Sequence, residues 1–307
     1  MSILVVGSSN TDFSLKVKSL PKPGETVLGN GFAVKAGGKG ANQAVAAARL
    51  NSDVKFCCKV GDDTNGEAAL SSYRKEGIDE AYFLVDKETP SGAALIFVDE
   101  KGENSIAVAS GANLRMTPSD IDRIGSFSKF DIVLTQLEIP LDTVSKVCTM
   151  AHRDGAMVVL NPAPAQSLSI DLLSNVDIIT PNETEAQILT GVKIENEEDA
   201  VRAAEVLCSK GVKAVVITLG KKGAFIFDGQ SGALVPAFTV KAVDTTAAGD
   251  VFNGALCTAL AEGKKLADAV VFASATSALS VTRNGAQDSA PHREEVEEFL
   301  KINNKKA

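Results

Sequence analysis

Short apolar runs alternate along the chain with segments in which apolar residues recur every three or four positions. Six runs rich in valine and isoleucine have the length of buried strands: residues 3–6, 54–60, 132–134, 157–160, 176–179 and 214–219. Segments with helical periodicity lie between and after them: residues 41–50, 66–76, 141–152, 183–189, 200–210, 247–261, 266–281 and 293–301. Strands and helices that alternate in this way predict a mostly parallel sheet covered by helices on both faces.

Two segments depart from this pattern. Residues 12–36 and 92–109 alternate polar and apolar side chains around glycine, proline and acidic turns, which predicts antiparallel strands with one solvated face. Neither segment has enough apolar residues for a core, so we expect them to form a small sheet, or lid. The predicted fold class is α/β: one three-layer α/β/α domain over residues 1–307, with a central mostly parallel sheet and a small β-sheet lid.

Composition narrows the possible chemistry. The 307 residues are 45% hydrophobic and 23% charged, as in globular proteins, with a formal net charge of −8. An acidic chain is a poor candidate for non-specific binding to nucleic acid or a membrane surface, which needs a basic face. The only histidines, His152 and His292, are far apart, and tryptophan is absent. A multi-histidine metal site is therefore disfavoured, and catalysis would rest on carboxylates, backbone amides and small polar groups.

The cysteines and the N-terminus predict a cellular compartment. Five cysteines, two of them adjacent and none in a C-x-x-C pair, do not form a disulfide framework or a zinc site. The first residues have neither the basic region nor the long apolar region of a signal peptide. No run approaches the roughly 18 apolar residues of a spanning helix. We therefore expect a soluble protein of a reducing compartment, most simply the cytoplasm.

The segment 243–254 carries the strongest chemical signal. A strand ends near Val243, and a helix begins near Ala247 with almost no side chains in its first turn. The free N–H groups of such a turn favour an anion, and Asp250 lies in the same turn. Amides beside a carboxylate suit phosphoryl transfer to an alcohol. The alternative is structural: Thr245 or Thr246 is a plain N-cap, and Asp250 only complements the helix dipole.

A glycine-rich segment precedes the helix predicted at 41–50. Three glycines around Lys39 allow a ligand to approach the backbone closely, and Lys39 with Asn42 suits a ligand rich in hydroxyl groups. The segment is not a Walker A loop, because glycine and not serine or threonine follows Lys39, and it lacks the dinucleotide fingerprint. A tight turn without a ligand remains the alternative.

Further polar residues follow predicted strands. Asn182 and Glu185 have the spacing of a capping box, and they also stand where α/β proteins bind ligands. The glycine-bounded turn at 218–223 would border a nucleotide. Asp12 would bind sugar hydroxyls or make an Asx-turn, and Glu138 would bind hydroxyls or be a solvated loop charge.

Three motifs in register resemble one family, the ribokinase-type sugar kinases, and the match extends over essentially the whole chain. They are Gly37-Gly38-Lys39-Gly40-Ala41-Asn42, Asn182-Glu183-Thr184-Glu185 and Asp244-Thr245-Thr246-Ala247-Ala248-Gly249-Asp250. The resemblance implies ATP-dependent phosphorylation of D-ribose at its 5-hydroxyl, with Mg²⁺ and an activating monovalent cation, normally K⁺. It also implies a homodimer formed through the lid.

The resemblance assigns roles to individual residues. Asp250 would be the catalytic base, and the anion hole would consist of the amides of Ala247, Ala248 and Gly249. Sugar would contact Asn10, Thr11, Asp12, Gly38, Lys39, Gly40, Ala41, Asn42, Glu138 and Asp250. Nucleotide would lie near Asn182, Thr218, Leu219, Gly220, Lys221, Lys222, Gly223, Gly249, Asp250 and Ser274. Glu185 would organise Mg²⁺ through water, and K⁺ would lie at Asp244, Thr246, Ser280, Arg283, Gly285 and Ser289, mostly on backbone oxygens.

Other functions remain open. Deoxyribose, fructose and adenosine are alternative substrates within the family, although Asp12 and Asn42 suit vicinal hydroxyls. A non-catalytic sensor of sugar or nucleotide is a second class, and an NAD-dependent oxidoreductase a third, which the missing fingerprint disfavours. If Asp250 is the base, we expect the start of its helix to depress its pKa.

Overall fold

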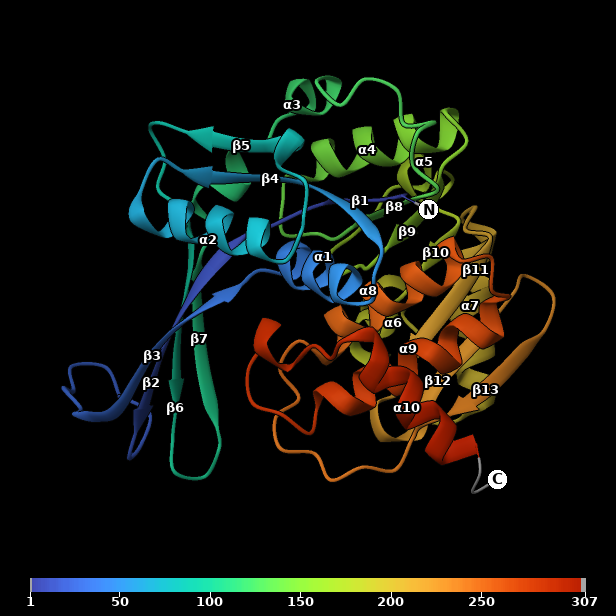
Figure 1. Ribbon diagram of the computed structural model, residues 1–307. Helices are drawn as coiled ribbons and strands as arrows, with labels where there is room; N and C mark the ends of the chain where they lie inside the picture. The colour runs from blue at the N-terminus through green and yellow to red at the C-terminus, as the bar shows by residue number, and fades with distance from the viewer. Residues whose placement is uncertain (1, 305–307) are drawn as a thin grey trace.

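The computed structural model describes residues 2–304 and has three layers, with a small second sheet that projects to one side (Figure 1). The central sheet has nine strands. In spatial order they are β13 (Gly232–Pro236), β12 (Gly223–Phe227), β11 (Ala214–Thr218), β10 (Ile178–Ile179), β9 (Met157–Leu160), β8 (Ile132–Thr135), β1 (Ser2–Val6), β4 (Asp53–Gly61) and β5 (Phe83–Asp86). All neighbours pair in parallel except β11 with β12 and β12 with β13.

Helices cover both faces of this sheet because its strands are apolar on both sides. In β1, Leu4 and Val6 belong to one core, and Ile3 and Val5 to the other. The first core is covered by α3 (Pro118–Asp122), α4 (Leu141–Arg153), α5 (Ile170–Leu173), α6 (Glu183–Thr190) and α7 (Glu197–Ser209). The second is covered by α1 (Lys39–Arg49), α2 (Thr64–Lys75), α8 (Ala248–Ala261), α9 (Leu266–Ser280) and α10 (Arg293–Asn304).

The small sheet contains the two segments with alternating patterns. Its spatial order is β3 (Gly29–Gly37), β2 (Asn10–Val17), β6 (Gly92–Val98) and β7 (Asn104–Ala109). The expectation of purely antiparallel strands is wrong for the central pair, because β2 and β6 run parallel. Each follows directly on a strand of the parallel sheet, β2 on β1 and β6 on β5, so both leave that sheet in the same direction (Figure 1).

The fold class is confirmed, and every predicted helix is present with ends shifted by a few residues. The sequence reading missed β5, β12, β13 and the short helices α3 and α5. The predicted strand at 176–179 is reduced to two residues of β10. Among residues 2–304, no helix is long and apolar enough to cross a membrane.

Candidate active site

The predicted site residues converge at the carboxyl ends of the parallel strands, on the side from which the small sheet projects. Ser8 and Asn10 follow β1, Glu138 follows β8, and Asn161 and Asn182 follow β9 and β10. The first turns of α1 and α8 face the same place, because a side chain in each, Asn42 and Asp250, meets the other by a hydrogen bond. Ligands of open α/β sheets bind at such an edge.

The glycine segment exists because α1 begins in contact with the turn after β1. Gly38 has a φ of 90°, and a Cβ there would lie 2.8 Å from the backbone nitrogen of Asn10. A Cβ on Gly40 would lie 2.6 Å from the backbone nitrogen of Ser8, and the Ala41 N–H donates to the Ser8 carbonyl at 2.9 Å. The glycine segment therefore forms a tight turn, as in the structural alternative. The same turn also positions Lys39 and Asn42 in the candidate site.

The start of α8 has the open amides expected of an anion site. Ala247 is the N-cap residue of α8 and has a left-handed backbone conformation, with a φ of 58°. Its side chain makes no capping hydrogen bond. Neither Thr245 nor Thr246 is the N-cap, because Ala247 stands at that position and no side chain caps the helix; the Thr246 hydroxyl donates to Asp244 instead. The Ala248 N–H donates to the Thr245 carbonyl at 3.2 Å, but among the described residues the N–H groups of Ala247 and Gly249 have no partner. A Cβ on Gly249 would meet nothing within 4 Å, so this turn opens to space.

Asp250 is buried, with 6% of its surface exposed, and both carboxylate oxygens accept hydrogen bonds. Asn42 Nδ2 donates to Oδ2 at 2.9 Å, and Gln43 Nε2 donates to Oδ1 at 3.0 Å. Burial raises the pKa of Asp250 and outweighs the opposing effects of Lys39 and the two amides. The expectation of a depressed pKa is therefore wrong, because loss of hydration dominates at this helix start.

Other charges surround Asp250. Burial raises the pKa of Asp12 to about 6, with added repulsion from Glu138 and Asp250. Burial by itself would lower the pKa of Lys39, but the carboxylates of Asp250, Glu138 and Glu185 outweigh it and raise that pKa. One ammonium group thus stands among several carboxylates, as in a site that binds hydroxyls and phosphate together.

The residues predicted to bind sugar differ in how firmly they are held. Asn10 Oδ1 accepts from Asn113 Nδ2 at 2.7 Å, which leaves the amide nitrogen of Asn10 for a ligand. Glu138 Oε2 accepts from the Ser8 hydroxyl and from the Lys39 N–H, so it is not a solvated loop charge. The Asp12 carboxylate lies against Gly37, where a Cβ would come within 2.3 Å of both oxygens. Among the described residues no hydrogen bond closes an Asx-turn at Asp12.

Other predicted sugar contacts lie deeper. Thr11 is 9% exposed, and Gly40 is buried. Ala41 is fully buried in the core beneath α1, where its methyl group packs.

The predicted nucleotide residues lie along the neighbouring strand ends. Asn182 and Thr218 form an isolated parallel bridge, and Lys222 pairs with Glu183 at 3.5 Å. The capping box is present: Asn182 Oδ1 accepts from the Glu185 N–H, and Glu185 Oε2 from the Asn182 N–H, both at 2.8 Å. Gly220, Lys221 and Lys222 form a short 3-10 turn that ends at Gly223, Leu219 packs into the core, and Ser274 is half-buried on α9.

The predicted cation residues come from two segments that the fold brings together. Asp244 Oδ1 accepts hydrogen bonds from the Thr246 N–H and hydroxyl, at 2.9 and 2.6 Å. Asp244 Oδ2 accepts from the Gly285 N–H at 2.9 Å. Burial opposes ionisation of Asp244, but these hydrogen bonds outweigh it and lower its pKa. The Ser280 and Ser289 hydroxyls donate to backbone carbonyls. The guanidinium of Arg283 pairs with Glu295 on α10, so only its backbone is available here.

The sequence reading missed the polar residues behind the site. Ser8 and Asn113 are buried and bonded to the predicted residues Glu138 and Asn10. Gln43 bonds Asp250 directly, and the buried Gln136 and Asn161 bond Gln43. A usable signal exists for Gln136 and Asn161, which directly follow β8 and β9. For Gln43 the sequence offers no such signal, because this residue is an ordinary position within the predicted helix.

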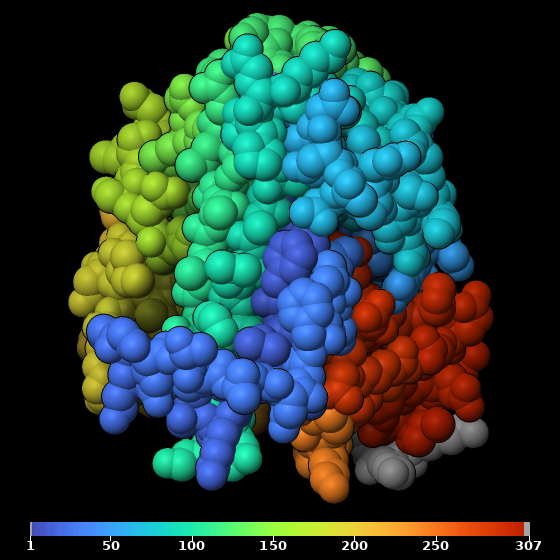
Figure 2. Space-filling model, turned by 90° about the vertical axis from the view of Figure 1, so that its left-hand side faces the viewer, coloured from blue at the N-terminus to red at the C-terminus, as the bar shows by residue number. Residues whose placement is uncertain are grey.

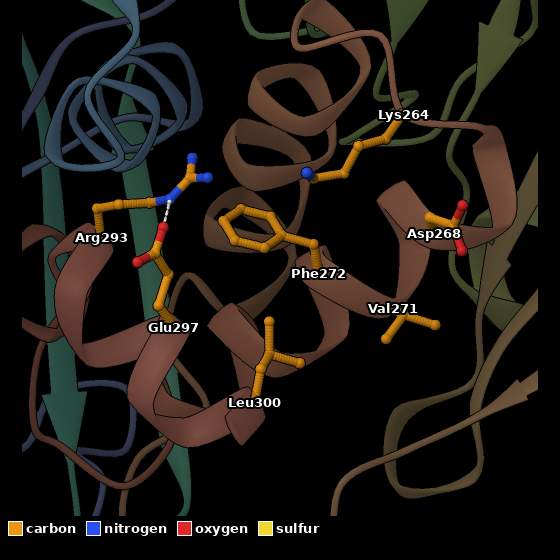
Figure 3. A pocket seen from close by; sticks show the side chains of 7 residues that line it. All are labelled: Lys264, Asp268, Val271, Phe272, Arg293, Glu297 and Leu300. Carbon is orange, nitrogen blue, oxygen red and sulfur yellow. Dashed lines mark hydrogen bonds and ion pairs between the residues drawn. The ribbon is translucent and has the colours of Figure 1, made fainter. Parts of the chain in front are cut away.

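A cavity of about 370 Å³ lies elsewhere, between α9 and α10 (Figure 3). It contains none of the predicted site residues. Two of its charged groups are paired with each other: Arg293 Nε donates to Glu297 at 2.8 Å, and the Arg293 guanidinium also lies over the Phe272 ring at 5.0 Å. The candidate site is therefore the group of residues at the strand ends.

Comparisons with known proteins agree with the geometry. Residues 1–293 match the family described as pfkB family carbohydrate kinase, and the chain belongs to that family. It is 46% identical over 300 residues to the ribokinase of Haemophilus influenzae, which covers 97% of this chain and 98% of that protein. It is 39% identical over 305 residues to a deoxyribokinase of Salmonella typhi, 99% of this chain and 100% of that protein.

A solved structure of Arabidopsis thaliana ribokinase with ribose and ATP superposes with a TM-score of 0.91 at 33% identity, covering 97% of this chain and 98% of that one. The protein is thus a carbohydrate kinase of this family, and the sequence-based identification of the family is confirmed.

Proposed function

We propose that this protein transfers the γ-phosphoryl group of ATP to the 5-hydroxyl of D-ribose, with Asp250 as the base. One observation carries the proposal: a buried carboxylate with both oxygens bonded lies in a helix turn whose amides at Ala247 and Gly249 are open. The similarity to ribokinases, one of them solved with ribose and ATP, supports ribose as the acceptor.

In this mechanism the sugar is oriented before it reacts. Asp12 and Glu138 accept from ring hydroxyls, while Lys39, Asn42 and the free amide nitrogen of Asn10 donate. Gly38 and Gly40 shape the floor, while Ala41, buried in the core, and Thr11, on the side of β2 opposite to Asp12, support it from behind. Such fixed contacts convert a bimolecular encounter into an oriented one.

Asp250 then aligns the 5-hydroxyl and takes its proton as the oxygen bonds to the γ-phosphorus and the bond to ADP breaks. The amides of the first turn of α8, at Ala247, Ala248 and Gly249, lie where negative charge develops on the transferred group. The raised pKa of Asp250 suits this role, because a base with a pKa nearer neutrality accepts a proton more readily.

We place the nucleotide along Asn182, Thr218–Gly223 and Ser274, with Mg²⁺ at Glu185. Within residues 2–304, no three acidic, histidine or cysteine side chains gather as a metal cluster. The donor set nevertheless fits Mg²⁺, which is commonly held by one carboxylate, substrate phosphates and water. Glu185 would supply that carboxylate through its second oxygen, and the ion would neutralise charge on the phosphate oxygens.

We place an activating monovalent cation at the loop of Asp244, Thr246, Ser280, Arg283, Gly285 and Ser289. The lowered pKa of Asp244 favours its carboxylate form, and the hydrogen bond from the Gly285 N–H joins it to the second segment, whose backbone oxygens would complete an oxygen donor set of the kind that K⁺ takes. Replacing K⁺ by a large organic cation should lower both turnover and the unfolding temperature of the ligand-free protein. In Asp244→Asn the unfolding temperature should no longer depend on the cation. An unfolding temperature of the wild type that is equal in both salts would contradict this site.

The small sheet and its partner complete the proposal. We infer that the sheet is the lid of a single domain, since Asp12 faces the site from its inner side. Side chains alternate along β2, so Phe13 and Leu15 lie on the opposite side with Phe32, Val34 and Leu95. Phe32 is 66% exposed and Leu95 53%, and a second copy of the chain would cover them.

The five free cysteines support a cytoplasmic setting.

The decisive test of the catalytic proposal compares two first-turn aspartates. Asp250→Asn should reduce kcat by roughly 10²–10⁴ with little change in ribose affinity, because it removes the proton acceptor and keeps the shape. Asp268→Asn is the matched control, since Asp268 lies in the first turn of α9 beside the remote cavity (Figure 3). Near-normal turnover of Asp250→Asn would refute the assignment.

Substrate choice is tested by comparing ribose, 2-deoxyribose, fructose and adenosine. Ribose should have the highest kcat/KM, because Asp12 and Asn42 both find partners on vicinal hydroxyls and 2-deoxyribose lacks one of them. A higher kcat/KM for 2-deoxyribose would assign the protein to the activity of its deoxyribokinase relative.

A further inference from the structure

A line of buried amides lies directly behind Asp250. Gln136 Nε2 donates to Gln43 Oε1 at 2.6 Å. Gln43 Nε2 in turn donates to Asp250 Oδ1 and to Asn161 Oδ1, both at 3.0 Å. Gln43 and Gln136 are fully buried. These residues come from α1, the end of β8, the end of β9 and α8, so four elements meet at one side chain.

The Gln43 amide can point in only one direction. Both protons of its nitrogen are donated and its oxygen accepts from Gln136, so its main bonding capacity is used. Turning the amide over would set its oxygen against the oxygens of Asp250 and Asn161, and its nitrogen against that of Gln136. The carboxylate of Asp250 therefore fixes the amide nitrogen of Gln43 toward itself, and the Gln43 oxygen in turn receives the amide nitrogen of Gln136.

The network is costly for the fold, which argues against a purely structural role. Gln136 Oε1 and the neighbouring Thr135 hydroxyl are buried and have no hydrogen-bond partner within residues 2–304. An unsatisfied buried polar atom destabilises the fold, and apolar side chains of the same size would avoid that cost. Gly7 makes room for the arrangement, since a Cβ there would lie 2.0 Å from Gln136 Oε1.

We propose that Gln43 is a positioning residue for phosphoryl transfer: it holds one oxygen of the Asp250 carboxylate from behind, so that the carboxylate is presented to the sugar hydroxyl in a single orientation, and Gln136 supports it through the bond to its amide oxygen. The inference rests on the proposed role of Asp250 as the base. Asn42, next along α1, holds the other oxygen from the sugar side. The two neighbours thus fix the plane of the carboxylate.

The test uses Gln43→Met, which has a similar length and no hydrogen bond, and Gln43→Glu, which has the same shape but presents an acceptor to Asp250. In Gln43→Met we expect kcat to fall about 10- to 100-fold, as for a small misplacement of a reacting group, with the KM values for ribose and ATP within about twofold. The acidic limb of the kcat profile should move to higher pH, because a lost donor favours the protonated carboxylate. In Gln43→Glu, kcat should fall further than in Gln43→Met, because the new carboxylate repels that of Asp250.

Thr258→Val is the control for loss of stability alone, since it removes a buried hydroxyl two turns further along α8 and should keep kcat. Carboxyl ¹³C NMR of the ligand-free protein, assigned with Asp250→Asn, should show a higher pKa for Asp250 in Gln43→Met. This readout needs no substrate, so it separates failure of this inference from failure of the proposed reaction. An unchanged Asp250 titration in Gln43→Met, or turnover within twofold of the wild type, would overturn the inference.

Discussion

Asp12 shows how a binding residue weakens the free protein. Its carboxylate is partly buried, has no hydrogen bond among the described residues, and is repelled by Glu138 and Asp250, which together raise its pKa to about 6. A carboxyl group whose pKa is higher in the folded than in the unfolded state destabilises the fold once it ionises. The loss is therefore absent below the ordinary value of 3.8 and complete above about 6.

Asp12→Asn should therefore raise the stability of the ligand-free protein at neutral pH by about 1–3 kcal/mol and leave it unchanged in acid below the ordinary aspartate pKa. The same change should raise the KM for ribose, because the amide offers fewer acceptor sites to hydroxyls. Denaturant unfolding at both pH values, with steady-state kinetics, checks both parts. A variant less stable than the wild type at neutral pH would contradict the destabilising effect that we assign to ionised Asp12.

At the scale of an element, the start of α1 does two things at once. The helix begins so close to the turn after β1 that only glycine fits at Gly38, and this closeness brings Lys39, Asn42 and Gln43 to the site. The backbone that makes the helix start tight is therefore the backbone that positions the groups proposed to bind the sugar.

Gly38→Ala should destabilise the protein by roughly 1–3 kcal/mol and raise the KM for ribose, because the Cβ forces the chain at Asn10 to move. Gly24→Ala is the matched control. Gly24 also has a positive φ, 80°, but its Cβ would meet nothing within 4 Å. It should cost about 1–2 kcal/mol from backbone strain and leave the KM unchanged. Thermal unfolding and steady-state kinetics of both variants test this prediction. An equal change in the KM for ribose in the two variants would contradict the role given to Gly38.

For the whole molecule, the small sheet has two different sides. Its inner side brings Asp12 and Lys35 toward the site, where Lys35 lies 4.0 Å from Asp288. Its outer side exposes the large apolar side chains of Phe32, Val34 and Leu95, and Figure 2 shows the N-terminal strands of this sheet, in blue, at the surface of the molecule. If two chains associate through this apolar surface, as proposed, the same sheet would link substrate binding to that association.

Sedimentation velocity tests this association. The wild type should sediment as a dimer, and Phe32→Asp combined with Leu95→Asp should sediment as a monomer with a higher KM for ribose, because a charged outer side no longer pairs. Ile170→Asp should leave the dimer intact, since Ile170 is 64% exposed on α5, away from this sheet. A monomeric wild type at working concentration would contradict the dimer.

The amino-acid sequence by itself determined the alternation of strands and helices, the capping box at Asn182 and Glu185, and the family, because these depend on residues a few positions apart. The tertiary structure decided what depends on distant segments. Gln43 and Asp250 are 207 positions apart, and Gln43 and Gln136 are 93. The parallel pairing of β2 with β6 follows from the strands that precede them. The raised pKa of Asp250 follows from burial by the whole fold, which outweighs the local helix start that the sequence shows.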